Sequence, residues 1–232
     1  MTTTALTSAD VRQQRPARLA QASDTTVASS STSSVPAVPA DARVAVIGDS
    51  HTYGAFGKHL QADLQKRLQQ GGGKLVSFTG VPSSGVSNWL RGTDTQAGPQ
   101  TFHTPTIDDV LKSKPKVLVV ALGSNMLGNT PEGNRRQIEA LLDKADKAGA
   151  KVVWVGPPNM RGFNGNLRGP QPEQRFYDAL KSVNDKRAAQ GKQPITIVDS
   201  RKSTREQDAV DGVHFQGGPA AAWEQDVFRR LT

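Results

Sequence analysis

From residue 43 onward, short apolar runs alternate with segments in which apolar residues recur every three or four positions. Five of the runs are nearly continuous in apolar character, as strands buried on both faces are. They cover residues 44–47, 75–79, 117–122, 152–155 and 195–198. Strands of this kind, separated by helical segments, are typical of a parallel sheet with helices on both faces. The pattern therefore predicts an α/β protein.

The segments between these runs have the period of amphipathic helices. Phe56, Leu60, Leu64 and Leu68 recur at every fourth position and place one apolar stripe against the sheet. Three glycines at residues 71–73 end this helix, and similar apolar faces recur at 138–148 and 176–183. We expect one domain of three α/β/α layers over residues 42–232, with about five strands in a central parallel sheet.

Residues 1–41 lack any sustained apolar periodicity and are rich in Ser, Thr, Ala and Pro. A segment of this composition cannot repay the entropy of ordering, so we expect a disordered tail. Its first residues lack the positive region and the apolar stretch of a secretory signal peptide. Any export would use a non-classical or specialised route, and the sequence leaves the compartment open.

The amino-acid composition argues against several classes of protein. The 232 residues carry 29 Lys and Arg against 21 Asp and Glu, a net charge of +8, and no Cys. Without Cys there is no disulfide or thiolate nucleophile, and the four histidines lack paired metal spacing, so we expect neither a metal nor a cofactor. Basic residues are scattered and aromatic residues make up only 5% of the chain, which disfavours nucleic-acid binding. No apolar run approaches the roughly 20 residues of a membrane span, so we expect a soluble protein.

The candidate chemistry lies at the ends of the expected strands. Ser50 follows the first strand, and Asp211 and His214 lie ahead of the final helix. In open α/β sheets the ligand binds at the carboxyl ends of the strands. A serine hydroxyl needs a base to become a nucleophile, and an imidazole base needs a carboxylate on its other nitrogen. We expect Ser50, His214 and Asp211 to converge as nucleophile, base and orienting carboxylate.

The same reaction needs fixed donors for the negative charge of a tetrahedral intermediate. The backbone N–H of Ser50 lies at a strand-to-helix turn, where a helix N-terminus favours negative charge. The backbone N–H of Gly85 and the side-chain amide of Asn125, which follow the second and third strands, are donors of the right kind. We expect these three groups to form an oxyanion hole, with Gly80 as a weaker alternative to Gly85.

Four blocks of the sequence carry a family resemblance: Ile-Gly-Asp-Ser at 47–50, Gly85, Gly-Ser-Asn at 123–125, and Asp-Gly-Val-His at 211–214. In order and approximate spacing they resemble the blocks of the SGNH, or GDSL, hydrolases. The resemblance covers everything beyond the tail and implies a flavodoxin-like fold and the residue roles named above. His51 stands where the full family string has leucine, and Pro-Ser-Ser-Gly at 82–85 lacks the usual asparagine. The chain has no GxSxG, which argues against an α/β-hydrolase elbow.

Three further residues are candidates for contact with a substrate. His51 adjoins the nucleophile on a loop expected to be exposed. Trp89 is a ring that either stacks on a sugar or packs in the core. Asn159 opens a loop that either hydrogen-bonds a ligand or is a surface turn. Asp49 is expected to cap the helix that follows it.

Together these residues predict a serine esterase that works through an acyl-enzyme. The family resemblance favours an O-acetyl group on a carbohydrate, including peptidoglycan, and the positive charge suits an anionic wall polymer. Long-chain lipolysis is disfavoured because the loops expected around the site are mostly Gly, Asn, Ser, Thr and Arg. The alternatives are a lipolytic esterase, a thioesterase or an acyltransferase on the same fold, and a catalytically inactive binding module. We expect a monomer.

Overall fold

The computed structural model describes residues 37–161 and 171–232. Packing starts earlier than the boundary expected at residue 42. Val38 is fully buried, and its backbone N–H donates to the carbonyl oxygen of Leu231 at 2.8 Å. The packed part therefore includes the last residues of the predicted tail, while residues 1–36 of that tail lie outside the described residues.

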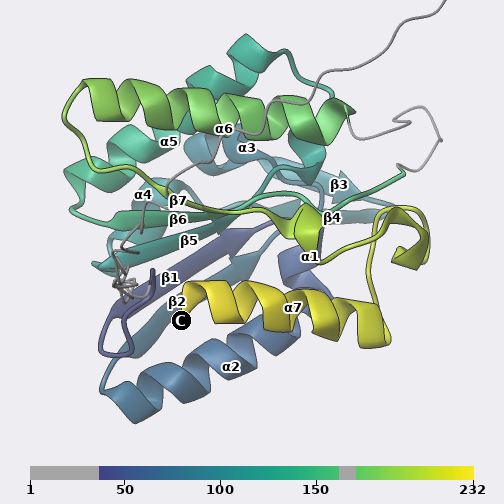
Figure 1. Ribbon diagram of the computed structural model, residues 1–232, viewed down its shortest axis with the longest axis horizontal. Coiled ribbons are helices and arrows are strands. Elements are labelled where there is room, and N and C mark those ends of the chain that lie inside the picture. The colour runs from purple at the N-terminus through teal and green to yellow at the C-terminus, as the bar shows by residue number, and fades with distance from the viewer. Residues whose placement is uncertain (1–36, 162–170) are drawn as a thin grey trace, which may run out of the picture. The chain divides into compact units, whose positions relative to one another are not determined.

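Five parallel strands form the central sheet in the order β2-β1-β5-β6-β7, as Figure 1 shows. Each one coincides, within a residue or two, with an apolar run of the sequence, which confirms the predicted fold class. Their bounds are β1 (Arg43–Gly48), β2 (Lys74–Gly80), β5 (Val117–Ala121), β6 (Lys151–Val155) and β7 (Thr196–Val198).

Helices cover both faces of this sheet. In Figure 1, α5 and α6 lie on one face, and α2 and α7 lie on the other. The helices of the first face are α3 (Val86–Arg91), α4 (Ile107–Leu111), α5 (Pro131–Lys147) and α6 (Gln171–Ala189), and those of the second are α2 (Ala55–Gly71) and α7 (Gly217–Leu231). Within the described residues, no helix combines the length and the apolar character needed to cross a membrane.

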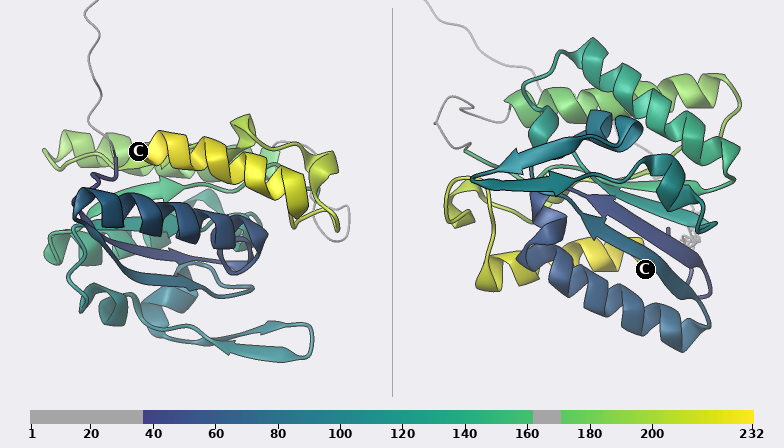
Figure 2. Two further views of the ribbon diagram at one scale, coloured as in Figure 1. Left: turned by 90° about the horizontal axis from the view of Figure 1, so that it is seen from below. Right: turned by 180° about the vertical axis from the view of Figure 1, so that it is seen from behind.

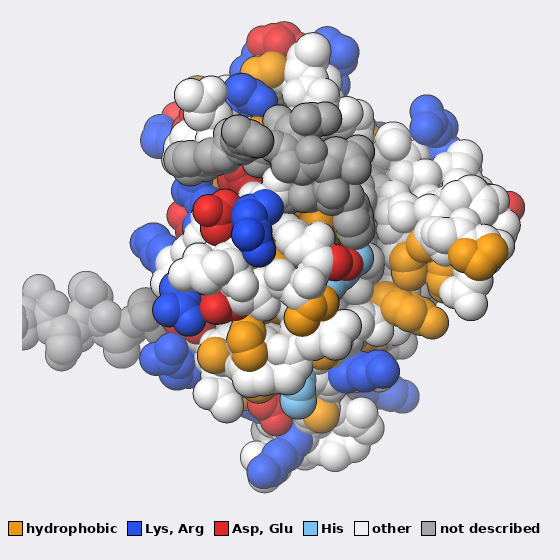
Figure 3. Space-filling model, turned by 90° about the vertical axis from the view of Figure 1, so that its right-hand side faces the viewer, with side chains coloured by type: hydrophobic (Ala, Val, Ile, Leu, Met, Phe, Trp, Pro, Cys, Tyr) orange, Lys and Arg blue, Asp and Glu red, His pale blue; other side chains and the backbone are white. Residues whose placement is uncertain are grey.

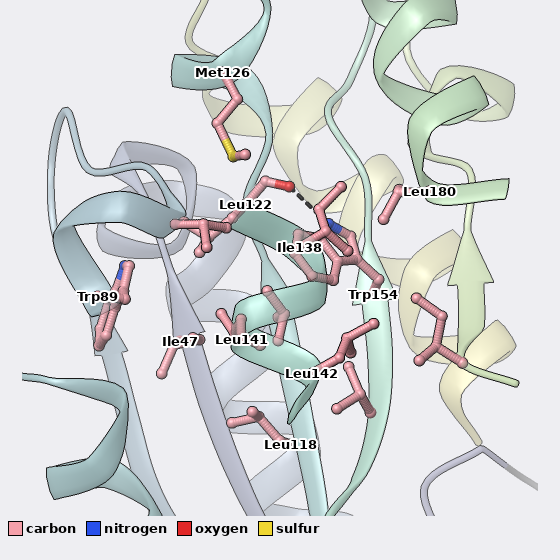
Figure 4. Packing of buried hydrophobic residues seen from close by; sticks show 14 of the residues in the cluster. Ile47, Trp89, Leu118, Leu122, Met126, Ile138, Leu141, Leu142, Trp154 and Leu180 are labelled. Carbon is pink, nitrogen blue, oxygen red and sulfur yellow. Dashed lines mark hydrogen bonds between the residues drawn. The ribbon is translucent and has the colours of Figure 1, made fainter. Parts of the chain in front are cut away.

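The two faces of the sheet bury separate hydrophobic clusters. In β1, Ile47 belongs to the cluster beneath α5 and α6, whereas Val46 belongs to the cluster beneath α2 and α7. Figure 4 shows the first cluster, in which the indole of Trp154 donates to the carbonyl oxygen of Leu122 at 2.8 Å. In the second cluster, the ring of Trp223 on α7 stacks on Phe56 of α2 with 3.9 Å between the ring centroids. This alternation along β1 is what a strand buried on both faces requires.

A small hairpin follows α3 and was not predicted from the sequence. It consists of β3 (Asp94–Ala97) and β4 (Gln100–His103), which pair antiparallel, and it projects from the sheet in the left-hand view of Figure 2. The hydroxyl of Thr95, which is buried, donates to the carbonyl oxygen of Pro82 at 2.7 Å. The hairpin is therefore fixed to the loop that follows β2.

Candidate active site

The site lies at the carboxyl ends of β1 and β5, where the strand order reverses. The chain crosses from β1 to its neighbour β2 on one side, and later returns to β5 on the other side of β1. In doubly wound sheets such a switch point opens a crevice between the loops that follow the two strands. Ser50 follows β1, and the 3₁₀ turn Ser124–Met126 follows β5.

Local backbone chemistry places Ser50 at the first position of a short helix, α1 (Ser50–Tyr53). Asp49 caps this helix as expected, because its carboxylate accepts the backbone N–H of His51 at 3.0 Å. Gly48 leaves room for the turn, since a Cβ at this position would lie 1.9 Å from the hydroxyl oxygen of Thr52. The N–H groups of a first helical turn have no acceptor within the helix, so the turn presents both the hydroxyl and the N–H of Ser50 at the sheet edge.

Asp211 and His214 come together on the loop ahead of α7. The Oδ2 atom of Asp211 lies 2.7 Å from Nδ1 of His214, while Oδ1 accepts the backbone N–H groups of Val213 and His214 at 3.0 and 2.7 Å. Partial burial alone would raise the pKa of Asp211, but these hydrogen bonds outweigh it and lower the pKa to about 2. The carboxylate therefore stays ionised and holds the imidazole in one orientation.

The other ring nitrogen of His214 reaches the serine. Nε2 lies 3.0 Å from Oγ of Ser50, although the two residues are 164 positions apart in the chain. With Asp211 on the opposite nitrogen, the three side chains form one continuous line of contacts. An imidazole in this position can take a proton from the hydroxyl and return it to a leaving group, which is the arrangement of a serine hydrolase triad.

The expected oxyanion donors have different surroundings. Asn125 lines the same cavity as Ser50, and its Nδ2 donates one hydrogen bond to the carbonyl oxygen of Ser84 at 3.0 Å, which leaves its second hydrogen for another acceptor. The N–H of Gly85 donates to Oδ1 of Asn88 at 2.9 Å, within the cap of α3, and Gly85 is not a lining residue of the cavity. The alternative, Gly80, packs against the backbone of α1 instead. The geometry thus supports Ser50 and Asn125 as donors more directly than either glycine.

A cavity of about 620 Å³ opens over Ser50. Figure 3 looks onto this edge of the sheet and shows hydrophobic side chains gathered around the hollow. The expectation that mostly polar loops surround the site needs correction, because the unpredicted hairpin and the loop ahead of α7 contribute apolar side chains. The apolar lining residues are Tyr53, Ala55, Phe56, Pro82, Ala97, Phe102, Met160, Val213 and Phe215.

His51 is buried rather than exposed, which corrects the sequence expectation. Only 6% of its surface is accessible, and its ring packs 5.5 Å from the ring of His214 and 5.2 Å from that of Trp223. Among the described residues its Nε2 has no hydrogen-bond partner. Burial lowers the pKa of His51 to about 3. His51 is thus a neutral ring that supports the His214 imidazole from behind, in addition to bordering the cavity.

Exchanging His51 for the leucine of the family string is expected to make the protein more resistant to acid. The unfolded chain protonates His51 near pH 6.5, but the folded protein resists protonation down to about pH 3. Stability that is present above pH 6.5 is therefore lost as the pH falls, by up to roughly 1.4 kcal/mol for each pH unit. Urea unfolding of His51→Leu and of the parent protein at pH 7 and pH 5 measures this difference. His59→Leu, at an exposed position, is the control. If all three proteins lost the same free energy of unfolding between pH 7 and pH 5, the explanation would be contradicted.

Two candidates for substrate contact lie elsewhere. Trp89 is fully buried, and its indole donates to the hydroxyl of Ser84 at 3.1 Å, so it packs in the core and borders no part of the cavity. The side-chain amide of Asn159 donates to the carbonyl oxygens of Arg201 and Thr204 at 2.9 and 2.7 Å. These bonds tie the loop after β6 to the loop after β7. The structure therefore gives both residues structural contacts and supports neither as a substrate ligand.

Asp49 is a second carboxylate directly behind the nucleophile. It is 1% exposed, and burial raises its pKa to about 7 despite the N–H of His51, the charge of His214 and the hydroxyl of Ser124. Its environment is thus opposite to that of Asp211, whose carboxylate stays charged. Within residues 37–161 and 171–232, no group of three or more His, Asp or Glu side chains is arranged to hold a metal ion.

The amino-acid sequence of the chain matches the model of a known protein family. A model of the GDSL-like lipase/acylhydrolase family matches residues 46–217. The chain belongs to this family. It is therefore a GDSL-type ester hydrolase, as the four sequence blocks predicted. The matched range contains Ser50, Asn125, Asp211 and His214.

Several solved structures have the same fold. One is a variant of an acetyl xylan esterase from Geobacillus stearothermophilus, with a TM-score of 0.58 and 12% identity over 84% of this chain and 96% of that one. A carbohydrate acetylesterase family member from Sinorhizobium meliloti has a TM-score of 0.54 and 15% identity over 82% and 99%. A GDSL-like lipase from Bacteroides thetaiotaomicron has a TM-score of 0.54 and 14% identity over 82% and 87%. No curated protein matches the sequence of this GDSL hydrolase.

Sequence reasoning missed Tyr53 and the hairpin as parts of the site. Tyr53 lies one turn after Ser50 on α1, where residues three apart share a face. The hairpin had a weak signal, because Gly98 and Pro99 form a dipeptide that marks turns. Its strands have only four residues each, too few to show a clear alternation of apolar and polar positions.

Proposed function

We propose that this GDSL hydrolase cleaves carboxylic esters through an acyl-enzyme on Ser50. His214 takes the hydroxyl proton through Nε2 while Oγ bonds to the ester carbonyl carbon. It then gives that proton to the alcohol oxygen as the carbon–oxygen bond breaks. Water next attacks the acyl carbon and transfers a proton to His214, which returns it to Oγ as the acid leaves. The observation that carries the proposal is the continuous line of contacts from Asp211 through His214 to Ser50.

In this mechanism the side-chain amide of Asn125 and the backbone N–H of Ser50 stabilise the oxyanion. Asn125→Asp keeps the shape of the side chain but removes the N–H donor, so we expect kcat for a short-chain nitrophenyl ester to fall by about 100- to 1,000-fold. Because Asn125 also holds Ser84, thermal unfolding must show that the variant is folded. A folded variant with less than a tenfold loss of kcat would remove Asn125 from the oxyanion hole.

For the alcohol part of the ester we favour a carbohydrate. The acetyl xylan esterase and the carbohydrate acetylesterase family member share the fold over more than four fifths of this chain, and the net charge of +8 suits an anionic wall polymer. Acetylated xylan and O-acetylated peptidoglycan are the substrates to compare, with release of acetate as the measurement. The second candidate is an ester with a longer apolar acyl group, which the apolar lining of the cavity favours.

A fluorophosphonate probe tests the chemistry independently of the substrate. Such a probe reacts with a serine whose proton is taken by an adjacent base, and mass mapping then shows which residue it modifies. We expect one labelled peptide that contains Ser50, and loss of labelling in His214→Ala. An unlabelled folded protein would support the catalytically inactive binding module instead. Product analysis with sugar or coenzyme A acceptors separates hydrolysis from acyl transfer or thioester cleavage.

A further inference from the structure

The cavity over Ser50 has two different walls. The loop ahead of α7 forms one wall and carries His214. The hairpin, with Tyr53, forms the facing wall. Tyr53 is 56% exposed, one of two large hydrophobic side chains with such exposure among the described residues. Its ring meets the ring of Phe102 edge-on at 5.6 Å, so the two aromatic rings form one continuous apolar surface beside the nucleophile.

The hairpin presents two apolar side chains, Ala97 and Phe102, to the cavity. Cross-strand partners share a face of a two-stranded sheet, and so do residues two apart. The pairs Thr95–Phe102 and Ala97–Gln100 therefore lie on one face, and Ala97, Phe102 and Gln100 all line the cavity. The other face carries the pair of Asp94 with His103, which do not line the cavity, and the hydrogen bond from Gln96 to Thr101. Gln96 also lines the cavity, so the hairpin adds polar as well as apolar groups to it.

The chemistry at Ser50 assigns a direction to each part of an ester. Of the groups on the tetrahedral carbon, the oxyanion points to its hydrogen-bond donors, which include Asn125. The alcohol oxygen must lie within reach of the proton on Nε2 of His214, and so on the wall that carries this residue. The acyl group takes the remaining direction, toward Tyr53 and the hairpin.

We propose that the wall formed by Tyr53, Ala97 and Phe102 is an acyl subsite, which selects esters of straight-chain apolar acids longer than acetate. The proposal rests on ester hydrolysis at Ser50 and, of the two substrate candidates above, selects the longer apolar acyl group over acetate. The cavity volume of about 620 Å³ falls within the range of sites that enclose whole small-molecule ligands and exceeds the needs of an acetyl group. Ala97 and the adjacent Gly98, which both line the cavity, are small and take up little of its volume.

The test varies the acyl group while the alcohol stays constant. The substrates are nitrophenyl acetate, butyrate, hexanoate and octanoate. One methylene in an apolar pocket can change specificity by about 10- to 200-fold. We therefore expect kcat/KM of the parent protein to rise by about tenfold or more from the acetate to the hexanoate ester. Ala97→Leu fills the subsite and should lower the hexanoate-to-acetate ratio by about tenfold. His103→Leu, at an exposed position on the outer face of the same hairpin, is the control and should leave the ratio unchanged.

The outcomes separate this assignment from the proposed function. A parent protein that labels with the fluorophosphonate but hydrolyses the acetate ester as fast as the hexanoate ester overturns the acyl subsite alone. If a folded Ala97→Leu variant lost kcat/KM equally on all four esters, the wall would contact the alcohol part instead. That result would also overturn the acyl subsite. Absence of both labelling and hydrolysis in the parent protein would instead refute catalysis at Ser50.

Discussion

Replacing Ser50 by alanine is expected to lower kcat for nitrophenyl butyrate by at least about 10⁴-fold, which leaves only the residual catalysis that substrate binding and the oxyanion donors provide. Oγ of Ser50 lies 3.0 Å from Nε2 of His214, so this substitution removes the hydroxyl that the imidazole activates. The methyl side chain of alanine fits at the first position of α1, because the Ser50 side chain takes no part in capping that helix. Initial rates at saturating ester, measured beside thermal unfolding, check this expectation.

Ser83→Ala is the matched control for this variant. Ser83 lines the same cavity as Ser50, so its loss changes the cavity by the same hydroxyl group without touching the proposed nucleophile. We expect its kcat to stay within about tenfold of the parent value. A Ser50→Ala protein that hydrolyses the ester as fast as Ser83→Ala would end the case for an acyl-enzyme at residue 50.

The second large effect is expected from Asp211→Asn, with a fall of kcat of about 10⁴-fold at neutral pH. The Oδ1 atom of an asparagine can still accept the backbone N–H groups of Val213 and His214, so the loop keeps its shape. Its amide, however, would present N–H groups to Nδ1 of His214 and favour the tautomer with the proton on Nε2. That tautomer cannot accept the proton of Ser50.

The pH profile distinguishes this loss from a general disturbance of the loop. Asp208→Asn is the control, since the Asp208 carboxylate pairs with Arg205 near the same loop. If the tautomer explanation holds, Asp211→Asn should recover part of its kcat at high pH, where hydroxide can take the Ser50 proton in place of the imidazole. Equal losses in the two asparagine variants, with unchanged profiles, would contradict the orienting role of Asp211.

The fold was predictable because its signal is local and repeated. Each buried parallel strand is an apolar run, and the stripe from Phe56 to Leu68 identifies α2 without any tertiary information. The hairpin was not predictable in this way, since its four-residue strands owe their position to contacts between segments distant in the chain, such as Thr95 with Pro82 and Phe102 with Tyr53. Its omission explains why the cavity was expected to have polar walls.

For the site, sequence order identified the residues at strand ends, but not their exposure. Ser50, Asp211 and His214 lie on loops whose position follows from the sheet, and the structure brings them together. His51 and Trp89 depend on which face of a short helix points inward, and a single helical turn shows no periodicity. The N–H of Gly85 donates to the side chain of Asn88, three residues later in the chain, and the position of a strand end does not reveal such a cap.

The stacking of Trp223 on Phe56 also has a consequence for synthesis of the protein. Ser50 on α1 and the adjoining helix α2 leave the ribosome early, whereas His214 and the helix that carries Trp223 follow more than 160 residues later. A nascent chain that ends before α7 has the nucleophile but no packed support for the base. Hydrolytic activity should therefore begin only after the last helix docks, and a partly translated enzyme cannot attack the esters of its own cell.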